Sequence, residues 1–241
     1  LCLPEFKGGR MKKYAALLCA LLSIPVLFGN AFAIVYSATD IFNQTTPGAT
    51  ATSGGALSLK TLDGFTGVGT ASSPVAGEID IGTNEFIKLT FDIPRIIDYF
   101  TIGTLFPDGE YGDTVNEIAQ IGYGAGNATV EATGFSAANI NGFDASASWT
   151  NPSIAEDSVG GGGVWRIDNP FGSLAIEYLI FTSLPGTTGS NTSLLDHRNS
   201  DYNVVNVATN PVPEPATMLL LGAGLIGLAG FGRKKFIKKQ T

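Results

Sequence analysis

The sequence predicts an all-β domain over residues 34–210, and three observations support this prediction. Short runs of apolar and β-branched residues recur here, separated by clusters of Gly, Pro, Asn, Asp and Ser. No stretch of helical length repeats its apolar residues with a 3.6-residue period. The chain is 44% hydrophobic, and a segment of this length can bury one sizeable core. We therefore expect a two-sheet β-sandwich of jelly-roll type.

The clearest predicted strand covers residues 86–91, where Ile87, Leu89 and Phe91 share one face and polar side chains share the other. Residues 92–95 include a proline and predict a turn. Residues 96–106 are apolar on both faces, which is typical of a central strand.

The remaining predicted strands are short and lie between turn-forming clusters. They cover residues 34–42, 56–62, 117–123, 128–135, 143–149, 164–169, 174–184 and 202–208. Residues 45–55, 160–163 and 186–193 read as loops because Gly, Ser and Thr dominate them. Large aromatic side chains are expected to anchor the core. They are Trp149, Trp165, Phe91, Phe171, Tyr178 and Phe181.

Residues 11–33 have the three parts of a secretory signal peptide. Met11 is followed by two lysines, an apolar stretch covers residues 14–28, and Ala31 and Ala33 form a small-x-small cleavage site for signal peptidase. Cleavage after Ala33 would make residue 34 the mature N-terminus. The alternative, a membrane anchor, fits less well because the apolar run is short. Residues 1–10 precede Met11 and are interpreted as an upstream extension.

The charge and the cysteines exclude several functional classes. The pI is about 4.6, and residues 34–211 contain nineteen acidic but only five basic residues, so a nucleic-acid partner is not expected. The two cysteines, Cys2 and Cys19, both precede the expected cleavage site. The mature chain would therefore contain neither a disulfide nor a cysteine-ligated metal.

The C-terminal end has three consecutive parts. Residues 211–215 read Pro-Val-Pro-Glu-Pro and are interpreted as motif and spacer. Residues 216–232 carry no charge, and the first basic residue after them is Arg233. Sixteen apolar residues in a helix span about 24 Å, which is marginal for a bilayer core of roughly 30 Å. We expect a transmembrane helix over residues 216–232, and a basic cytoplasmic tail over residues 233–241.

This end resembles the PEP-CTERM sorting signal of Gram-negative bacteria, which an exosortase in the membrane recognises. The resemblance implies an exported protein that is transiently anchored in the membrane and then sorted to the cell surface or extracellular matrix. The implied recognition residues are Val212, Pro213, Glu214, Pro215, Arg233, Lys234 and Lys235. The alternative is a plain C-terminal anchor. The order of features over residues 78–91 also resembles a β-sandwich type common among PEP-CTERM proteins, which supports the fold without assigning an activity.

The sequence contains few residues suited to catalysis. The single histidine, His197, stands in a polar loop, and no Gly-x-Ser-x-Gly elbow is present. Zinc rarely uses carboxylates alone. Glycoside hydrolysis needs two carboxyls about 5 to 10 Å apart across a cleft, and nothing in the sequence places the acidic loop at residues 106–113 in a cleft. We therefore do not expect an enzyme.

The same acidic loop supplies oxygen ligands next to glycines, which suits structural calcium. The candidate ligands are Asp108, Glu110, Asp113 and Glu117, with Glu78 and Asp80 as a second cluster. A solvated acidic turn is the alternative interpretation. No other cofactor is expected.

The leading hypothesis is a non-enzymatic exported surface or matrix protein in an exopolysaccharide-associated system. The alternative is a carbohydrate-binding module, assisted by calcium, in which aromatic faces pack on sugar rings; Tyr111, Tyr123 and Trp149 are the candidate platforms. A glycoside hydrolase is third.

Overall fold

The computed structural model describes residues 33–71, 76–81, 84–134, 137–153, 163–187 and 199–211, together with Gly222 and Leu225. Several predicted features lie outside these residues and stay predictions: the signal peptide before Ala33, His197, the recognition residues and the basic tail. The expected transmembrane helix at residues 216–232 is described only at Gly222 and Leu225. Within the described part of the chain, no helix is both long and apolar enough to cross a membrane.

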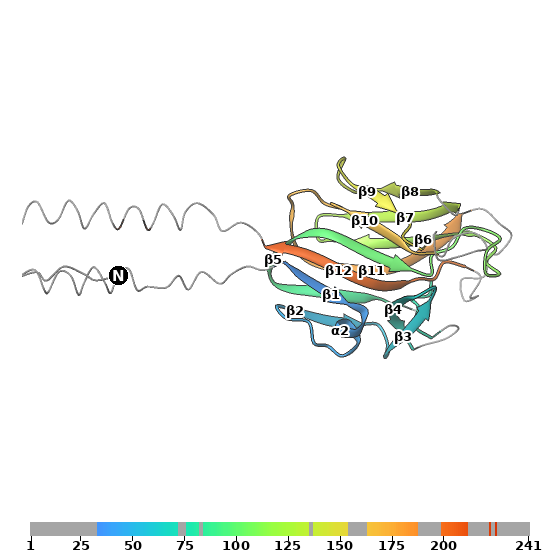
Figure 1. Ribbon diagram of the computed structural model, residues 1–241, viewed down its shortest axis with the longest axis horizontal. Helices are drawn as coiled ribbons and strands as arrows, with labels where there is room; N and C mark the ends of the chain where they lie inside the picture. The colour runs from blue at the N-terminus through green and yellow to red at the C-terminus, as the bar shows by residue number, and fades with distance from the viewer. Residues whose placement is uncertain are drawn as a thin grey trace, which may run out of the picture. The chain divides into compact units, whose positions relative to one another are not determined.

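The described residues form a mostly β structure, so the all-β prediction is confirmed (Figure 1). One short helix, α2 (Ala38–Phe42), follows the first strand. The strands are β1 (Ile34–Ser37), β2 (Ala49–Ser53), β3 (Leu57–Leu62), β4 (Phe65–Thr70), β5 (Ile87–Gly103), β6 (Asn116–Gly122), β7 (Asn127–Gly134), β8 (Ala137–Asn141), β9 (Ser148–Thr150), β10 (Trp165–Asp168), β11 (Ala175–Thr187) and β12 (Asn203–Pro211).

The strands pair into one large antiparallel sheet with the order β3-β4-β12-β5-β11-β6-β7-β8. Off this path, β1 pairs with β12, β2 and β10 pair with β5, and β9 pairs with β10. The hydrogen bonding is therefore continuous and does not divide the described strands into two separate sheets. The jelly-roll sandwich stays a prediction.

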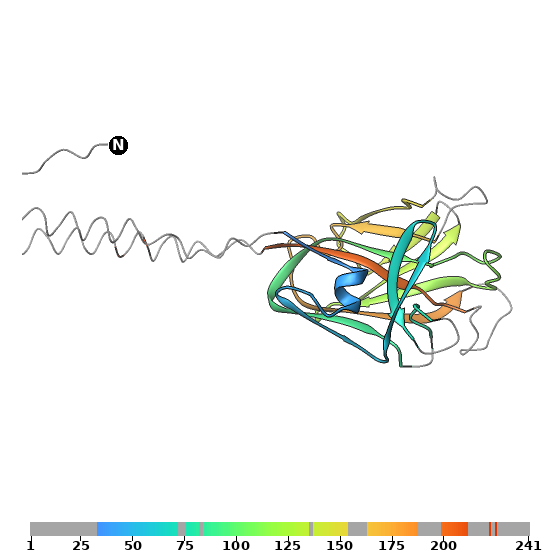
Figure 2. The ribbon, with the colours of Figure 1, turned by 60° about the horizontal axis from the view of Figure 1, so that its bottom comes forward.

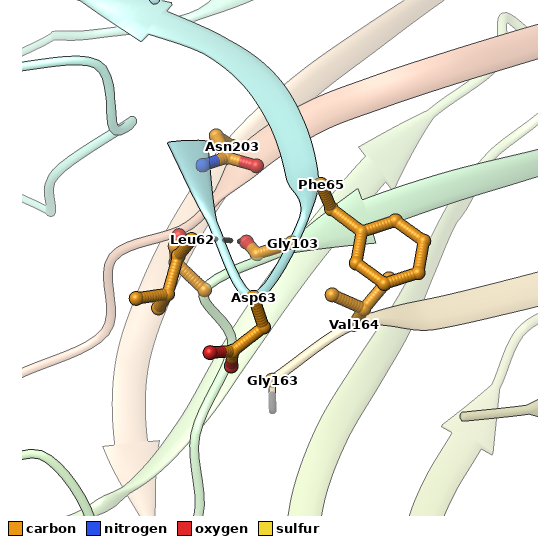
Figure 3. A pocket seen from close by; sticks show the side chains of 8 residues that line it. Leu62, Asp63, Phe65, Gly103, Gly163, Val164 and Asn203 are labelled. Carbon is orange, nitrogen blue, oxygen red and sulfur yellow. Dashed lines mark hydrogen bonds between the residues drawn. The ribbon is translucent and has the colours of Figure 1, made fainter. Parts of the chain in front are cut away.

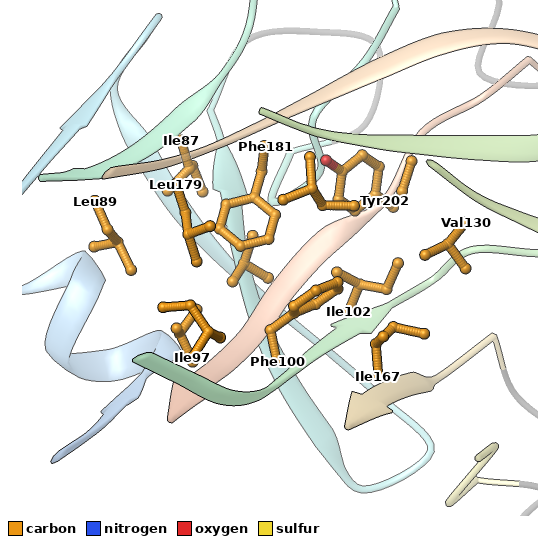
Figure 4. Close-up of a cluster of buried hydrophobic side chains, with 14 of the residues drawn as sticks. Ile87, Leu89, Ile97, Phe100, Ile102, Val130, Ile167, Leu179, Phe181 and Tyr202 are labelled. Carbon is orange, nitrogen blue, oxygen red and sulfur yellow. The ribbon is translucent and has the colours of Figure 1, made fainter. Parts of the chain in front are cut away.

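The sheet folds back over its own core because β5 is long and takes different partners along its length. Phe100 of β5 pairs with β10 and β12, whereas Phe181 of β11 pairs with the beginning of β5 and with β6. Although the two residues are not paired with each other, their rings meet edge to face at 5.9 Å. Figure 4 shows these two rings among buried side chains from several strands, and Figure 2 shows the curvature of the sheet.

Four of the six predicted aromatic anchors are buried: Trp165, Phe91, Phe171 and Phe181. Trp149 is only half-buried and packs edge to face against Trp165, with ring centroids 5.4 Å apart. Tyr178 is also half-buried, and the Lys88 ammonium lies 4.4 Å from the centre of its ring. The prediction that Tyr178 anchors the core was therefore wrong: its strand turns this side chain toward the surface.

The structure corrects the N-terminal strand prediction. The strand predicted at residues 34–42 ends at Ser37, where a capping box starts α2. The Ser37 hydroxyl accepts a hydrogen bond from the Asp40 backbone, and the Asp40 carboxylate accepts one from the Ser37 backbone. This reciprocal pair satisfies the first free N–H groups of the helix and stops the strand.

The structure differs from the sequence predictions at five further places. The turn predicted at residues 92–95 is part of β5, so two predicted strands are one. The strand predicted at residues 143–149 is reduced to β9. β2 lies inside the loop predicted at residues 45–55, and β4 and β8 were not predicted at all. The other predicted strands correspond to β3, β6, β7, β10, β11 and β12.

Candidate functional site

The two ends of the domain lie side by side. β1 and β12 are antiparallel neighbours, with Ile34 opposite Thr209. Both the first strand and the last therefore reach the same end of the sheet (Figure 1). The C-terminal segment leaves the domain directly from β12, which is also paired with β4 and β5. A membrane or enzyme that binds the C-terminal segment is therefore connected to the domain through β12, one of the central strands of the sheet.

An acidic cluster occupies the opposite end of β12. It contains Glu78, Asp80, Asp113, Glu117 and Asp201, and all five side chains are buried. β12 has nine residues, so at about 3.3 Å per residue it spans roughly 26 Å, and Asp201 lies two residues before its start. We call these five residues the acidic cluster.

Backbone hydrogen bonds fix the segment that contributes Glu78 and Asp80. The Thr70 N–H donates to the Glu78 carbonyl at 2.8 Å, and the Ile79 N–H donates to the Tyr202 carbonyl at 2.6 Å. The Asp80 N–H donates to the Glu85 carboxylate at 2.8 Å. These bonds fasten residues 78–80 to the end of β4 and to the chain entering β12.

Glu117 holds two loops together from inside the sheet. Its side chain is fully buried on β6, and its two oxygens accept hydrogen bonds from the Phe106 N–H at 2.5 Å and the Asp201 N–H at 2.9 Å. Burial raises the pKa of Glu117 well above its usual value, and the charges of Asp201 and Asp113 add to this effect, while the two backbone donors oppose it. Glu117 therefore positions the chain segments that carry Asp113 and Asp201.

The charges of the other carboxylates of the acidic cluster act on one another's pKa values. Burial, followed by the charge of Glu78, raises the pKa of Asp113 to about 7. Burial also raises the pKa of Asp201 well above its usual value, and the charges of Glu78, Asp80 and Asp113 act in the same direction. Lys60 on β3 opposes both shifts, and its ammonium forms an ion pair of 2.5 Å with Glu78.

The structure separates the predicted calcium ligands into two groups. Asp113 and Glu117 join Glu78 and Asp80 in the acidic cluster, whereas Asp108 is exposed and Glu110 is half-buried in the turn that precedes them. Sequence reasoning missed Asp201, which reaches the cluster from the other end of the chain. Among the described residues, the structure contains no group of three or more His, Cys, Asp or Glu side chains that could hold a metal ion.

The three aromatic residues considered as sugar platforms differ in exposure. Tyr111 is 56% exposed and stacks on Phe106, with ring centroids 4.4 Å apart. Tyr123 is half-buried, lies 4.2 Å from the ring of Phe171, and donates its hydroxyl hydrogen to the Gly142 carbonyl. Trp149 is half-buried against the core. Of the three, Tyr111 alone presents a largely exposed ring.

A small hollow lies beside the β3–β4 turn, with Phe65 and Val164 on one side and Asp63 at the tip of the turn (Figure 3). Its cavity volume is only about 10 Å³, room for about one water molecule and far below the roughly 300–1,000 Å³ of typical ligand pockets. The hollow therefore gives no support to an active-site cleft, and it does not include the acidic cluster.

Comparison with known families identifies the C-terminal segment. Residues 211–234 match the family described as PEP-CTERM protein-sorting motif. The search of curated proteins and the search of solved structures give no match. The match begins at residue 211, which is also the last residue of β12. It implies export, membrane-associated sorting and processing by an exosortase-type enzyme. The chain is therefore a protein that carries a PEP-CTERM sorting motif at the end of a β domain.

Proposed function

We propose that the chain is a non-enzymatic surface or extracellular-matrix protein of an exopolysaccharide-associated envelope. Signal peptidase would remove the residues before Ile34, and an exosortase would then process the chain in the membrane. The observation that carries this proposal is the PEP-CTERM motif, which starts where β12 ends, with no intervening linker.

The geometry of the domain suits this role. The neighbouring ends of β1 and β12 leave only one end of the sheet attached to the sorting segment. The acidic cluster and the exposed Tyr111 belong to the loops that precede β6 and β12, toward the other end. During sorting this other end would face away from the membrane, where matrix components are met.

Carbohydrate binding is the second candidate, favoured by the exposed Tyr111 ring and its support by Phe106. A ring held in one orientation costs little entropy when a sugar packs on it. A titration with the producing cell's own exopolysaccharide tests this candidate. Saturable binding that Tyr111→Ala weakens would support it, whereas equal binding by both proteins, or none, would oppose it.

Localisation of two variants tests the main proposal. One variant lacks residues 212–241, and the other keeps the predicted transmembrane segment but carries Pro213→Ala, Glu214→Ala and Pro215→Ala. We expect the first to reach the medium without a membrane-held form, and the second to accumulate uncleaved in the membrane fraction. Normal sorting of the triple variant, or retention of the truncated one in the membrane, would refute the sorting mechanism.

A further inference from the structure

We propose that Arg95 binds the carboxylate of Glu214 and so holds the sorting motif against the folded domain until an exosortase takes it. The ion pair would form within one chain. Its effect on processing rests on the proposed function, whereas the ion pair itself does not. Glu214 lies outside the described residues, and Arg95 and its surroundings lie within them.

Arg95 is a buried cation without a counterion among the described residues. Only 7% of its surface is exposed, and its Nε and Nη1 atoms have no hydrogen-bond partner there. No carboxylate of the described residues forms an ion pair with it. A buried charge is costly unless an opposite charge pairs with it and satisfies its hydrogen bonds. The guanidinium has five N–H donors and no acceptor, so the group that suits it is an anion with oxygen acceptors.

Neutral groups lie next to the guanidinium. Its Nη2 atom lies close to the backbone of Gly48, where an added Cβ would be 3.3 Å away. Arg95 also acts on Tyr36: burial raises the pKa of that hydroxyl, and the charge of Arg95 opposes the rise. The Tyr36 hydroxyl donates its hydrogen to the Pro47 carbonyl at 3.1 Å. These neighbours position the guanidinium without neutralising it.

The two acids nearest to Arg95 in the sequence do not pair with it. Asp92 and Asp98 are both exposed, and neither forms an ion pair with Arg95. The charge of Asp98 acts on Arg166, whose pKa is raised first by its hydrogen bond with Asp168. Asp92 is therefore the local competitor that a test has to separate from Glu214.

The sheet topology brings Glu214 close to Arg95. Arg95 of β5 is the register partner of Pro211, the last residue of β12. Paired Cα atoms of antiparallel strands lie about 5 Å apart. Glu214 follows three residues later, so its Cα lies at most about 11 Å from that of Pro211. Glutamate and arginine have long side chains that can bridge such a separation. Glu214 is also the only acidic residue that follows Asp201 in the sequence.

The proposed contact couples folding of the domain to presentation of the sorting motif. Once β5 and β12 have paired, Arg95 would hold Glu214, and the exosortase would have to displace it. A motif that is docked for part of the time is available to the enzyme only for the remainder, which lowers its apparent affinity. The folded domain would thus slow its own processing.

Melting temperatures of the full chain, produced in a host without an exosortase and purified in detergent, test the ion pair. Glu214→Gln leaves the buried guanidinium unpaired and should lower the melting temperature by at least about 2 °C. Arg95→Met removes the buried charge and returns Glu214 to water, so it should not lower the melting temperature. In the Arg95→Met background, Glu214→Gln should have no further effect. Glu177→Gln, at an exposed position on β11, is the charge-matched control.

Nitrogen-15 NMR of the arginine side chains gives a second readout that does not depend on stability. The Arg95 Nε–H signal, identified by its loss in Arg95→Met, should shift in Glu214→Gln. It should stay unchanged in Asp92→Asn and in Glu177→Gln. The proposal is overturned if Glu214→Gln leaves this signal or the melting temperature unchanged, or if Asp92→Asn produces the larger shift.

Pulse–chase analysis in the producing cell tests the consequence for processing. Arg95→Met should be processed at least about twofold faster than the wild type. Arg166→Met removes an arginine that pairs with Asp168 on β10, and it should be processed at the wild-type rate. Equal rates for all three proteins would overturn the holding role of Arg95. If none of the three is processed, the proposed function fails, and the melting temperatures still decide the ion pair.

Discussion

Replacing Glu117 offers the sharpest test of how the loops around the acidic cluster are held. The residue is fully buried, and its side chain is the acceptor for two buried backbone N–H groups, on Phe106 and Asp201. Glu117→Ala removes both acceptors. Glu117→Gln keeps one carbonyl oxygen but turns an amide NH₂ toward the other donor. The two variants therefore differ by one backbone hydrogen bond.

The structure sets the size of each effect. A buried donor left without a partner costs about 1–3 kcal/mol. Glu117→Ala should therefore lower the free energy of unfolding by about 2–6 kcal/mol, and Glu117→Gln by about 1–3 kcal/mol. The larger loss would be a substantial part of the roughly 5–15 kcal/mol typical of a folded domain.

Urea unfolding of the full chain in chelator, followed by the fluorescence of its two tryptophans, Trp149 and the buried Trp165, measures both losses. Glu177→Gln, on the exposed side of β11, is the control and should stay within about 0.5 kcal/mol of the wild type. The reasoning fails if Glu117→Ala costs less than about 1 kcal/mol, or if Glu117→Gln costs more than Glu117→Ala.

Three further predictions follow from buried groups. In chelator, the melting temperature should fall as the pH rises from 5 to 8. This is because the pKa of Asp113 is raised from its ordinary 3.8 to about 7, so the folded chain binds its proton more tightly than the unfolded chain over this range; a rise would contradict the shift. Gly69→Ala should lower the free energy of unfolding by about 1–3 kcal/mol, since its Cβ would lie 2.3 Å from the backbone nitrogen of Glu78. In the same urea assay Gly134→Ala, whose Cβ would lie 3.6 Å from its nearest neighbour, should cost less. Arg95→Met should leave the free energy of unfolding unchanged or raise it, because Nε and Nη1 of this buried side chain have no hydrogen-bond partner among the described residues; a loss above about 1 kcal/mol in urea unfolding would show that the guanidinium is stabilising.

The strands with a clear alternation were predictable, and the exceptions have identifiable causes. Pro94 suggested a turn, but the register of β5 with β11 jumps from Thr90 to Arg95. Pro94 therefore lies in an irregular stretch, where its missing N–H costs no ladder hydrogen bond. β4 was not predicted, and it contains Gly67 and Gly69, which weaken the sequence pattern of a strand. There the glycines allow Asn203 and the backbone at Glu78 to approach closely.

The edge strands were missed for a different reason. β2 reads Ala-Thr-Ala-Thr-Ser, while β8 is rich in Ala and Asn. Among the described strands, β2 pairs only with β5 and β8 only with β7. The inward residues of β2 are alanines, and β8 packs one large side chain, the half-buried Ile140, against the core, so the apolar alternation by which a strand is recognised from sequence is weak in both. Their positions are set by the strands next to them, through backbone pairing that any residue except proline can make.

For the acidic cluster, the position of Glu117 within its strand was a better guide from the sequence than the distance between acidic residues along the chain. Asp108 and Glu110 were predicted to bind an ion together with Glu117 because the three lie close in the sequence. In the structure Asp108 and Glu110 lie in the turn before β6, whereas Glu117 lies within β6. Glu117 lies on β6 in phase with Ala119 and Ile121, and all three are buried. A carboxylate at an inward position of an alternating strand must find partners inside the protein. Its partner, the Asp201 backbone, is 84 residues away and becomes a neighbour only through the sheet topology. The inward phase of Glu117 therefore predicts a polar cluster from sequence, while the identity of the other members follows from the order of the strands.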